Sequence, residues 1–121
     1  MSGENIDDYL NQGIYGKKRL NPEEQDRFLG TFRERVSIAL TMGQVRQKIV
    51  IKEVKDKLST TPNAKLLLNG KVDYGSLSKY VKLANGTQIP FSIVNNLERE
   101  TDIGLVVASN HAIDVEDIFI N

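Results

Sequence analysis

The chain has 121 residues, of which 40% are hydrophobic and 26% charged, and it contains no cysteine. This size and composition are typical of one globular domain and exclude a disordered or fibrous protein. Sixteen basic and sixteen acidic side chains cancel, which excludes a long-range charge attraction to nucleic acid or membrane, and the lack of cysteine excludes disulfides and thiol nucleophiles.

The first 20 residues are expected to form an N-terminal arm that precedes a single α/β domain at residues 21–121. The arm is acidic at its start and becomes basic and glycine-broken between Gly13 and Leu20. It lacks the apolar core of a signal peptide, and no apolar run in the chain approaches the roughly 20 residues of a membrane span. We therefore predict a cytoplasmic protein with no membrane partner.

The run from Asn21 to Gly43 predicts a long helix at the start of the domain. Asn21 is a favourable N-cap, and Pro22 suits the first helical position because its missing N–H has no helical partner there. Gly43 supplies a stop, and Gln44 to Gln47 is expected to form a short strand. Between the ends, apolar residues recur at three- and four-residue steps. They are Phe28, Leu29, Phe32, Val36, Ala39 and Leu40.

A second helix and a buried strand are predicted next. Ile51, Val54 and Leu58 give the helix one apolar face, and it is expected to end near residues 59–61. The following run, Ala64 to Leu68, contains three consecutive leucines bounded by turn residues, as expected of a strand that is covered on both faces. We predict that this strand lies in the centre of the sheet.

A third helix is expected to begin after Asp73, which is a favourable N-cap, and to end at Asn85 and Gly86. Pro90 cannot donate to a ladder, so it is predicted to stand at the beginning of a strand that runs to Val94.

Two more strands are predicted after this one, at residues 104–108 and, as a short last strand, at residues 118–120. Strands that alternate with helical patterns predict an α/β domain. We expect a three-layer α/β/α sandwich in which a mixed sheet of four to five strands follows the order βαβαββ after the N-terminal helix.

Five motifs spread over nearly the whole chain carry a family resemblance. They are GIYG at residues 13–16, FLGTFRERV at 28–36, LLLNG at 66–70, IPFSIV at 89–94 and DIGLVVA at 102–108. Their combination resembles the YueI-like family, a group of small uncharacterised cytoplasmic proteins of low-GC Gram-positive bacteria. The resemblance implies a mixed-sheet α/β fold grouped with the Bacillus-type chorismate mutases and the kink-turn-binding ribosomal proteins. It implies no activity, since one fold hosts many unrelated sites.

Basic side chains concentrate between Gln44 and Leu58, where five of them accompany two acidic ones. On a helix face they can meet phosphates, although a solvated helix surface with ion pairs to Glu53 and Asp56 accounts for the same lysines. The order of elements is similar to that of the kink-turn RNA binders, but their glycine, asparagine, glutamate and lysine signature is reduced here to Glu53 and nearby lysines. The candidate residues for an anionic partner, with two from the arm, are Lys17, Lys18, Arg46, Lys48, Lys52 and Lys55.

No catalytic, cofactor or metal site is predicted. His111 is the sole histidine, and its surroundings are more typical of a loop residue than of an acid–base catalyst. The glycines form neither a phosphate loop nor a dinucleotide fingerprint. The acidic residues at 98–102 and 116–117 lack the alternating spacing and the glycine of a calcium loop.

These patterns predict a non-enzymatic binding module, with RNA or a ribonucleoprotein as its most concrete partner and no DNA partner. The alternative is a protein-interaction or homo-oligomeric regulatory domain, because the basic residues of 44–58 and the acidic residues of 98–117 can attract each other between subunits. A third hypothesis, a small-molecule enzyme at a subunit interface, needs converging arginines and a pocket.

Overall fold

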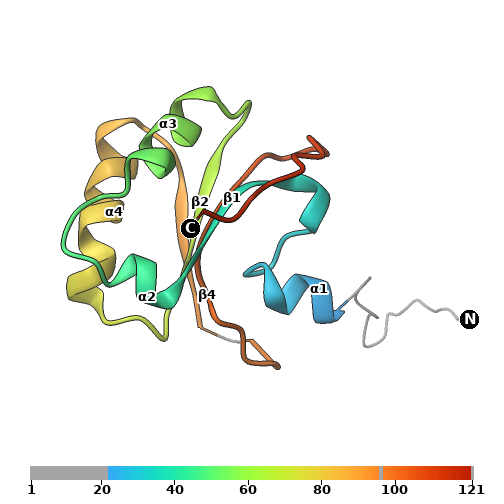
Figure 1. The fold of residues 1–121 in the computed structure, drawn as a ribbon, viewed down its shortest axis with the longest axis horizontal. Helices are drawn as coiled ribbons and strands as arrows, with labels where there is room; N and C mark the ends of the chain where they lie inside the picture. Colours follow the sequence, from blue (N-terminus) through green and yellow to red (C-terminus); the bar gives the residue numbers. More distant parts are fainter. Residues whose placement is uncertain (1–21, 96, 121) are drawn as a thin grey trace, which may run out of the picture.

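A computed structural model gives the fold, and it describes residues 22–95 and 97–120 (Figure 1). The elements are α1 (Pro22–Arg27), the 3₁₀ turn η1 (Arg33–Arg35), β1 (Val36–Thr41), α2 (Met42–Val45), α3 (Lys52–Thr60), β2 (Lys65–Asn69), α4 (Tyr74–Gly86), β3 (Phe91–Val94) and β4 (Ile103–Ala108). The strands form one sheet in the order β1-β4-β2-β3. Over the described ranges, no helix is long and apolar enough to cross a membrane.

The predicted α/β class and the mixed four-stranded sheet are confirmed. β1 and β2 both run antiparallel to β4, whereas β3 runs parallel to β2. The predicted central strand is also confirmed, because β2 lies between β4 and β3 and its leucines 66–68 are at most 5% exposed. The parallel pair is joined by α4, so this part of the chain is one βαβ unit.

Two groups of side chains cover the sheet from its two faces. α2, α3 and α4 lie on one face, which we call the helical face, and α1 with the C-terminal segment 109–120 lies on the other, which we call the opposite face (Figure 1). Leu66 and Leu68 pack in the core of the helical face and Leu67 in the core of the opposite face. Because the opposite face has only the short α1 and irregular chain, the description as three layers stays a prediction.

The predicted helix from Asn21 to Gly43 is wrong beyond Arg27. The chain turns at Leu29 (φ 57°) and Gly30 (φ 101°), both in the left-handed region that ends helices. Residues 36–41 then form β1 at the edge of the sheet.

The spacing of apolar residues misled the prediction because β1 is buried on both faces. Ile38 and Leu40 pack in the core of the helical face, whereas Val36 and Ala39 pack in that of the opposite face. A short, largely apolar and buried run of this kind fits a helical spacing as well as a buried strand. Val36, Ile38 and Thr41 are β-branched and favour the strand.

The predicted strand at Gln44 to Gln47 is wrong as well, because Met42–Val45 forms the short helix α2. Thr41 and Gln44 begin this helix with a capping box: the Gln44 N–H donates to Thr41 Oγ1 at 3.2 Å, and the Thr41 N–H donates to Gln44 Oε1 at 2.9 Å. A Cβ on Gly104 in β4 would lie 2.9 Å from the Met42 Cα. Glycine at this position therefore allows α2 to lie directly on the sheet.

Two further predictions concern the ends of the chain. The expected last strand at residues 118–120 is reduced to one isolated bridge between Ala39 and Phe119, in which the Ala39 N–H donates to the Ile118 carbonyl at 2.8 Å. This segment lines the outer side of β1. The arm at residues 1–20 lies outside the described residues, and a single domain at residues 21–121 stays a prediction.

Candidate functional site

The carboxyl ends of three strands lie together at one end of the sheet, which we call the carboxyl edge. Since β1 and β2 are antiparallel to β4 and β3 is parallel to β2, the ends of β1, β2 and β3 meet the start of β4 at this edge. In α/β sheets, ligands bind in crevices outside the carboxyl ends of the strands. The residues that follow these strands therefore form the candidate site.

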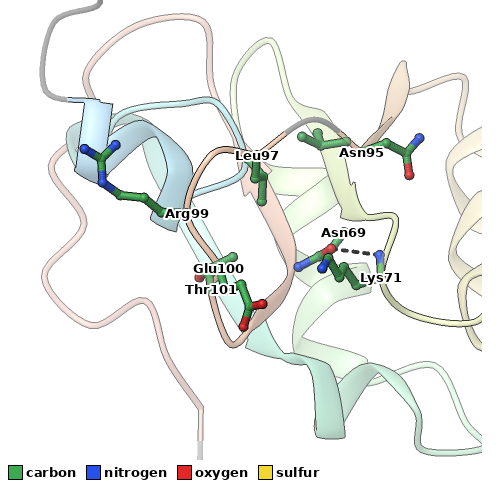
Figure 2. Close-up of a pocket in the computed structure, with 8 residues that line it drawn as sticks. Asn69, Lys71, Asn95, Leu97, Arg99, Glu100 and Thr101 are labelled. Carbon is green, nitrogen blue, oxygen red and sulfur yellow. Dashed lines mark hydrogen bonds between the residues drawn. The ribbon is translucent and has the colours of Figure 1, made fainter.

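Asn69, at the end of β2, braces this edge. Its side chain is buried, its Nδ2 donates to the Ile103 carbonyl at 2.9 Å, and its Oδ1 accepts from the Lys71 N–H at 2.9 Å (Figure 2). The amide thus ties β2 to β4 and fixes the turn that follows. Because both ends of the amide are engaged, Asn69 is a structural residue of the site rather than a ligand group.

Gly70 and Asn95 determine how closely the two loops at this edge approach each other. A Cβ on Gly70 would lie 1.8 Å from the Asn95 Oδ1 and 3.1 Å from the Val94 carbonyl oxygen. The Gly70 N–H donates to that same carbonyl at 2.9 Å. Only glycine at position 70 therefore lets the Asn95 side chain occupy its place beside the end of β2.

A cavity of about 240 Å³ lies between the end of β2 and the loop at residues 95–101 (Figure 2). Lys71 brings an exposed ammonium group to its rim and Glu100 an exposed carboxylate. The other lining residues are Asn69, Val94, Asn95, Leu97, Arg99 and Thr101. The cavity has the size for a small polar ligand and has charges of both signs.

Arg99 and Thr101, two polar residues that line this cavity, also bind α1. Arg99 Nη1 lies 3.2 Å from Asp26 Oδ2, and the Asp26 side chain is only 2% exposed. The Thr101 hydroxyl donates to the Arg27 carbonyl at 3.0 Å and accepts from the Ile103 N–H at 3.2 Å. Among the described lining residues, Lys71 and Glu100 are therefore the charged groups left for a ligand.

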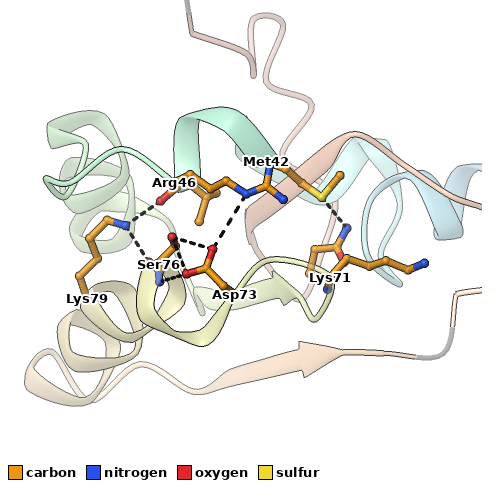
Figure 3. Close-up of polar contacts among 8 residues, drawn as sticks. Met42, Arg46, Lys71, Asp73, Ser76 and Lys79 are labelled. Atoms are coloured by element: carbon orange, nitrogen blue, oxygen red, sulfur yellow. Dashed lines mark hydrogen bonds and ion pairs between the residues drawn. The ribbon is translucent and has the colours of Figure 1, made fainter.

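Asp73 links the start of α4 to α2 (Figure 3). As predicted, it is the N-cap of α4, where its Oδ2 accepts from the Ser76 N–H at 2.9 Å. It also lies 4.0 Å from the Nε of Arg46. Hydrogen bonds from the Ser76 hydroxyl and N–H lower the pKa of Asp73. The carboxylate is therefore stabilised in its charged form.

Lys79 makes a second connection between the same two helices. Its Nζ donates to the Val45 carbonyl at 2.6 Å and to the Ser76 carbonyl at 2.7 Å (Figure 3). The ammonium group also lies 4.9 Å from the centre of the Tyr80 ring. Burial lowers the pKa of Lys79. This lysine holds the end of α2 against α4, so it is a structural cation and not part of the solvent-facing basic surface.

The structure divides the predicted basic residues into two groups. Arg46 pairs with Asp73, and Lys52 pairs with Asp56 at 2.9 Å, whose hydrogen bond raises the pKa of Lys52. Lys48 and Lys55 are exposed and form no ion pair within the described part of the chain. Lys17 and Lys18 lie outside the described residues.

The sequence analysis missed two exposed apolar side chains beside these cations. Ile49, between α2 and α3, is 70% exposed, and Tyr74, at the first position of α4, is 61% exposed. Tyr74 stands three residues before the buried Leu77, so its spacing resembles that of a core residue. Because Tyr74 lies in the first turn of α4, its side chain is exposed to solvent. Its sequence spacing is the same for an exposed and for a buried tyrosine.

The sole histidine lies away from this edge, after β4. Its Nδ1 is 2.9 Å from Asn110 Oδ1 and 3.3 Å from Ser109 Oγ. The Ser109 hydroxyl donates to the Pro62 carbonyl at 2.8 Å. Because the hydroxyl proton is committed to that carbonyl, this pair does not have the geometry of a nucleophile and its base. Among residues 22–95 and 97–120 there is also no group of His, Asp and Glu side chains that could hold a metal ion.

Comparisons with known proteins agree on one relationship. The family profile described as "Protein of unknown function (DUF1694)" matches residues 3–119. The "Uncharacterized protein YueI" of Bacillus subtilis (strain 168) is 42% identical over 120 residues, which cover 99% of this chain and 91% of that protein. The structure described as "Crystal structure of the YueI protein from Bacillus subtilis" aligns with a TM-score of 0.81 at 41% identity, covering 98% of this chain and 92% of the other.

Proposed function

The chain belongs to the family described as Protein of unknown function (DUF1694), in keeping with the resemblance of its motifs to YueI-like proteins, and we propose that it is a non-enzymatic RNA-binding module of the cytoplasm. The partner is single-stranded RNA, which contacts the helical face. A composition without cysteine fits a reducing compartment. The observation that carries the proposal is the unequal distribution of charge between the two faces of the sheet.

Residues 42–60 and 73–86, which form the three helices of the helical face and their caps, contain seven basic and three acidic side chains (Figure 1). A local excess of four positive charges attracts a phosphate backbone even though the whole chain is neutral. Lys48 and Lys55 are the candidate residues whose charge is not shared with a described acidic group. These two lysines are therefore expected to contribute most to phosphate binding.

The opposite face has the reverse charge and directs RNA away from itself. The segments that define this face, α1 and residues 109–120, contain six acidic side chains and one basic one, Arg27. Asp26 of this set is buried and pairs with Arg99. Phosphates approaching this side meet a negative potential, so the protein offers RNA one orientation only.

Exposed apolar groups among the cations favour single strands over duplexes. Tyr74, with its aromatic ring, is 61% exposed and follows Asp73, the residue that pairs with Arg46. Unstacked bases pack on such rings, and stacking contributes about 1–3 kcal/mol per base. Bases within a duplex cannot reach the ring. This feature supports RNA loops and single-stranded segments, rather than duplexes, as the ligands.

The proposal is tested by gel shift or filter binding with total cellular RNA at ordinary salt. We expect retention above that of a neutral control protein, and we expect Lys48→Glu to weaken it and to reduce the dependence on salt by about 0.7 per lost contact with a single strand. Lys65→Glu is the matched control, because Lys65 is an exposed lysine that lies at the first position of β2 and not on a helix of the helical face. Tyr74→Ala should weaken binding without changing the salt dependence. Absence of retention, or equal losses in the Lys48 and Lys65 variants, would contradict the proposal.

A further inference from the structure

The two edges of the sheet are protected differently. The outer side of β1 is lined by the C-terminal segment, whose Ile118 carbonyl accepts the Ala39 N–H at 2.8 Å. β3, the other edge strand, pairs with β2 on its inner side. No group within residues 22–95 and 97–120 hydrogen-bonds to the backbone of Phe91 or Ile93. One edge is thus covered by the chain itself, and the other presents unpaired backbone groups.

The register of β3 shows which of its backbone groups point outward. The Pro90 carbonyl accepts the Leu66 N–H and the Val94 carbonyl accepts the Gly70 N–H, both at 2.9 Å. In a parallel pair the bonded residues alternate, so residues 90, 92 and 94 face β2, while Phe91 and Ile93 direct their N–H and C=O groups outward. Proline often protects an edge strand, but the position of Pro90 faces inward and leaves this edge open.

Charge does not protect this edge either. No acidic or basic side chain occurs from Leu83 to Leu97, although charged residues make up 26% of the chain. Edge strands that do not pair with another chain usually carry lysines or other charged residues. An uncharged strand can face an identical copy of itself without like-charge repulsion.

We propose that β3 pairs with β3 of a second copy of this chain in an antiparallel arrangement with the twofold axis at Ser92. In this register Phe91 lies opposite Ile93 of the partner and exchanges two hydrogen bonds with it, and the symmetry repeats the contact, giving four backbone bonds. The side chains of Phe91 and Ile93 both lie on the helical face and are partly buried. Each phenylalanine therefore packs beside an isoleucine of the second copy across the axis.

The arrangement predicts an unusual dependence on salt. A twofold axis perpendicular to the sheet places the helical faces of both copies on the same side, where their basic residues repel each other. Salt screens that repulsion, so the dimer becomes more stable as salt increases. Self-association driven by attraction between the basic and acidic ends of the chain would show the reverse dependence.

Light scattering of the full chain at several concentrations and at low and high salt is the first test. We expect a mass of twice the 13.6 kDa of one chain, reached at lower protein concentration in high salt. Ser92 is exposed, so Ser92→Lys leaves the fold intact while placing two like charges on the axis, and it should restore the monomer mass. Ser59→Lys, which adds the same charge at an exposed position of α3, should not.

Disulfide formation tests the register independently, because the chain has no cysteine of its own. Residues opposite each other in a pair without hydrogen bonds have Cα atoms about 4.5 Å apart, which is within the range of a disulfide. Mild oxidation should convert Ser92→Cys into a covalent dimer and leave Ser59→Cys largely monomeric. The proposal requires both results. A monomer at every concentration and salt, a dimer that survives Ser92→Lys, or equal cross-linking of the two cysteine variants would overturn it.

Discussion

The two faces of the sheet are built by different physical means. The helical face is covered by α2, α3 and α4, which lie within residues 42–86, and beneath them is a large cluster of buried apolar side chains. The opposite face joins α1 and η1 to segments distant in sequence through polar contacts, such as Asp26 with Arg99 and the Glu34 carbonyl with the Ile113 and Asp114 N–H groups. Arg27 adds a contact by lying 5.0 Å and 5.7 Å from the rings of Phe28 and Phe119.

Burial alone therefore does not explain what holds a face of the sheet together. A face covered by long helices is stabilised by the removal of apolar area from water. A face covered by a short helix and irregular chain also needs its backbone groups and charges to find partners. The following substitutions test this comparison, in order of decreasing expected effect.

Leu68→Ala, in the core of the helical face, should reduce the free energy of unfolding by about 2–5 kcal/mol, because a tightly packed cavity cannot close. Leu67→Ala is the matched change on the opposite face, where Leu67 is 5% exposed. We expect a smaller loss there, since irregular chain can collapse into the space more readily than packed helices. Urea unfolding of both variants measures the difference, and equal losses would remove the proposed contrast in packing.

Asp26→Asn should destabilise the protein by about 1.5–3 kcal/mol, because a buried carboxylate loses its charged hydrogen bond to Arg99. Glu23→Gln, a similar change at an exposed position of the same helix, is the control and should have almost no effect. Chemical denaturation of the two variants provides the measurement. A loss of equal size in both variants would show that the polar contact does not support the opposite face.

Tyr80→Phe should cost about 1–3 kcal/mol, because the Tyr80 hydroxyl oxygen accepts the buried Ile51 N–H at 3.1 Å. Burial raises the pKa of Tyr80 above its ordinary value of 10.0. The stability that depends on neutral Tyr80 is therefore fully present below pH 10.0 and is lost as the pH rises through the raised pKa.

The difference in unfolding free energy between the wild type and Tyr80→Phe should accordingly be constant below pH 10.0 and shrink above it. Denaturation at a series of alkaline pH values measures this difference. Since other groups titrate in both proteins, the comparison isolates the tyrosine. A difference that does not change with pH would mean that Tyr80 ionises equally easily in the folded and unfolded chains.

Lys52→Gln should leave the melting temperature unchanged within error, although the Lys52–Asp56 distance of 2.9 Å is shorter than that of Arg99–Asp26. Both side chains of the first pair are more than half exposed, and water and salt screen such pairs. Thermal unfolding monitored by circular dichroism is sufficient as the measurement. A clear fall in melting temperature would show that the surface charges of the helical face also contribute to its stability.

Local signals predicted the parts of the fold that are made from neighbouring residues. Asp73 as the cap of α4, Pro90 before β3, and the buried leucines of β2 each depend on chemistry within a few residues, and the structure has them where the sequence predicts them. The candidate site was harder to predict. The cavity at the carboxyl edge is formed by loops after β2 and β3, and its lining depends on contacts such as that of Asn95 with Gly70.

Sequence patterns were sufficient for the α/β class and for the positions of β2, α4, β3 and β4, but they misplaced the first strand and missed α2. That residues 36–41 form a strand depends on tertiary contacts, because apolar spacing reports burial and not the backbone partner, and that partner is β4 near the other end of the chain. Tertiary contacts also determine that Tyr74 is exposed and that the outer side of β3 has no backbone partner among residues 22–95 and 97–120. These properties follow from which segments lie beside each other, and no local pattern encodes that arrangement.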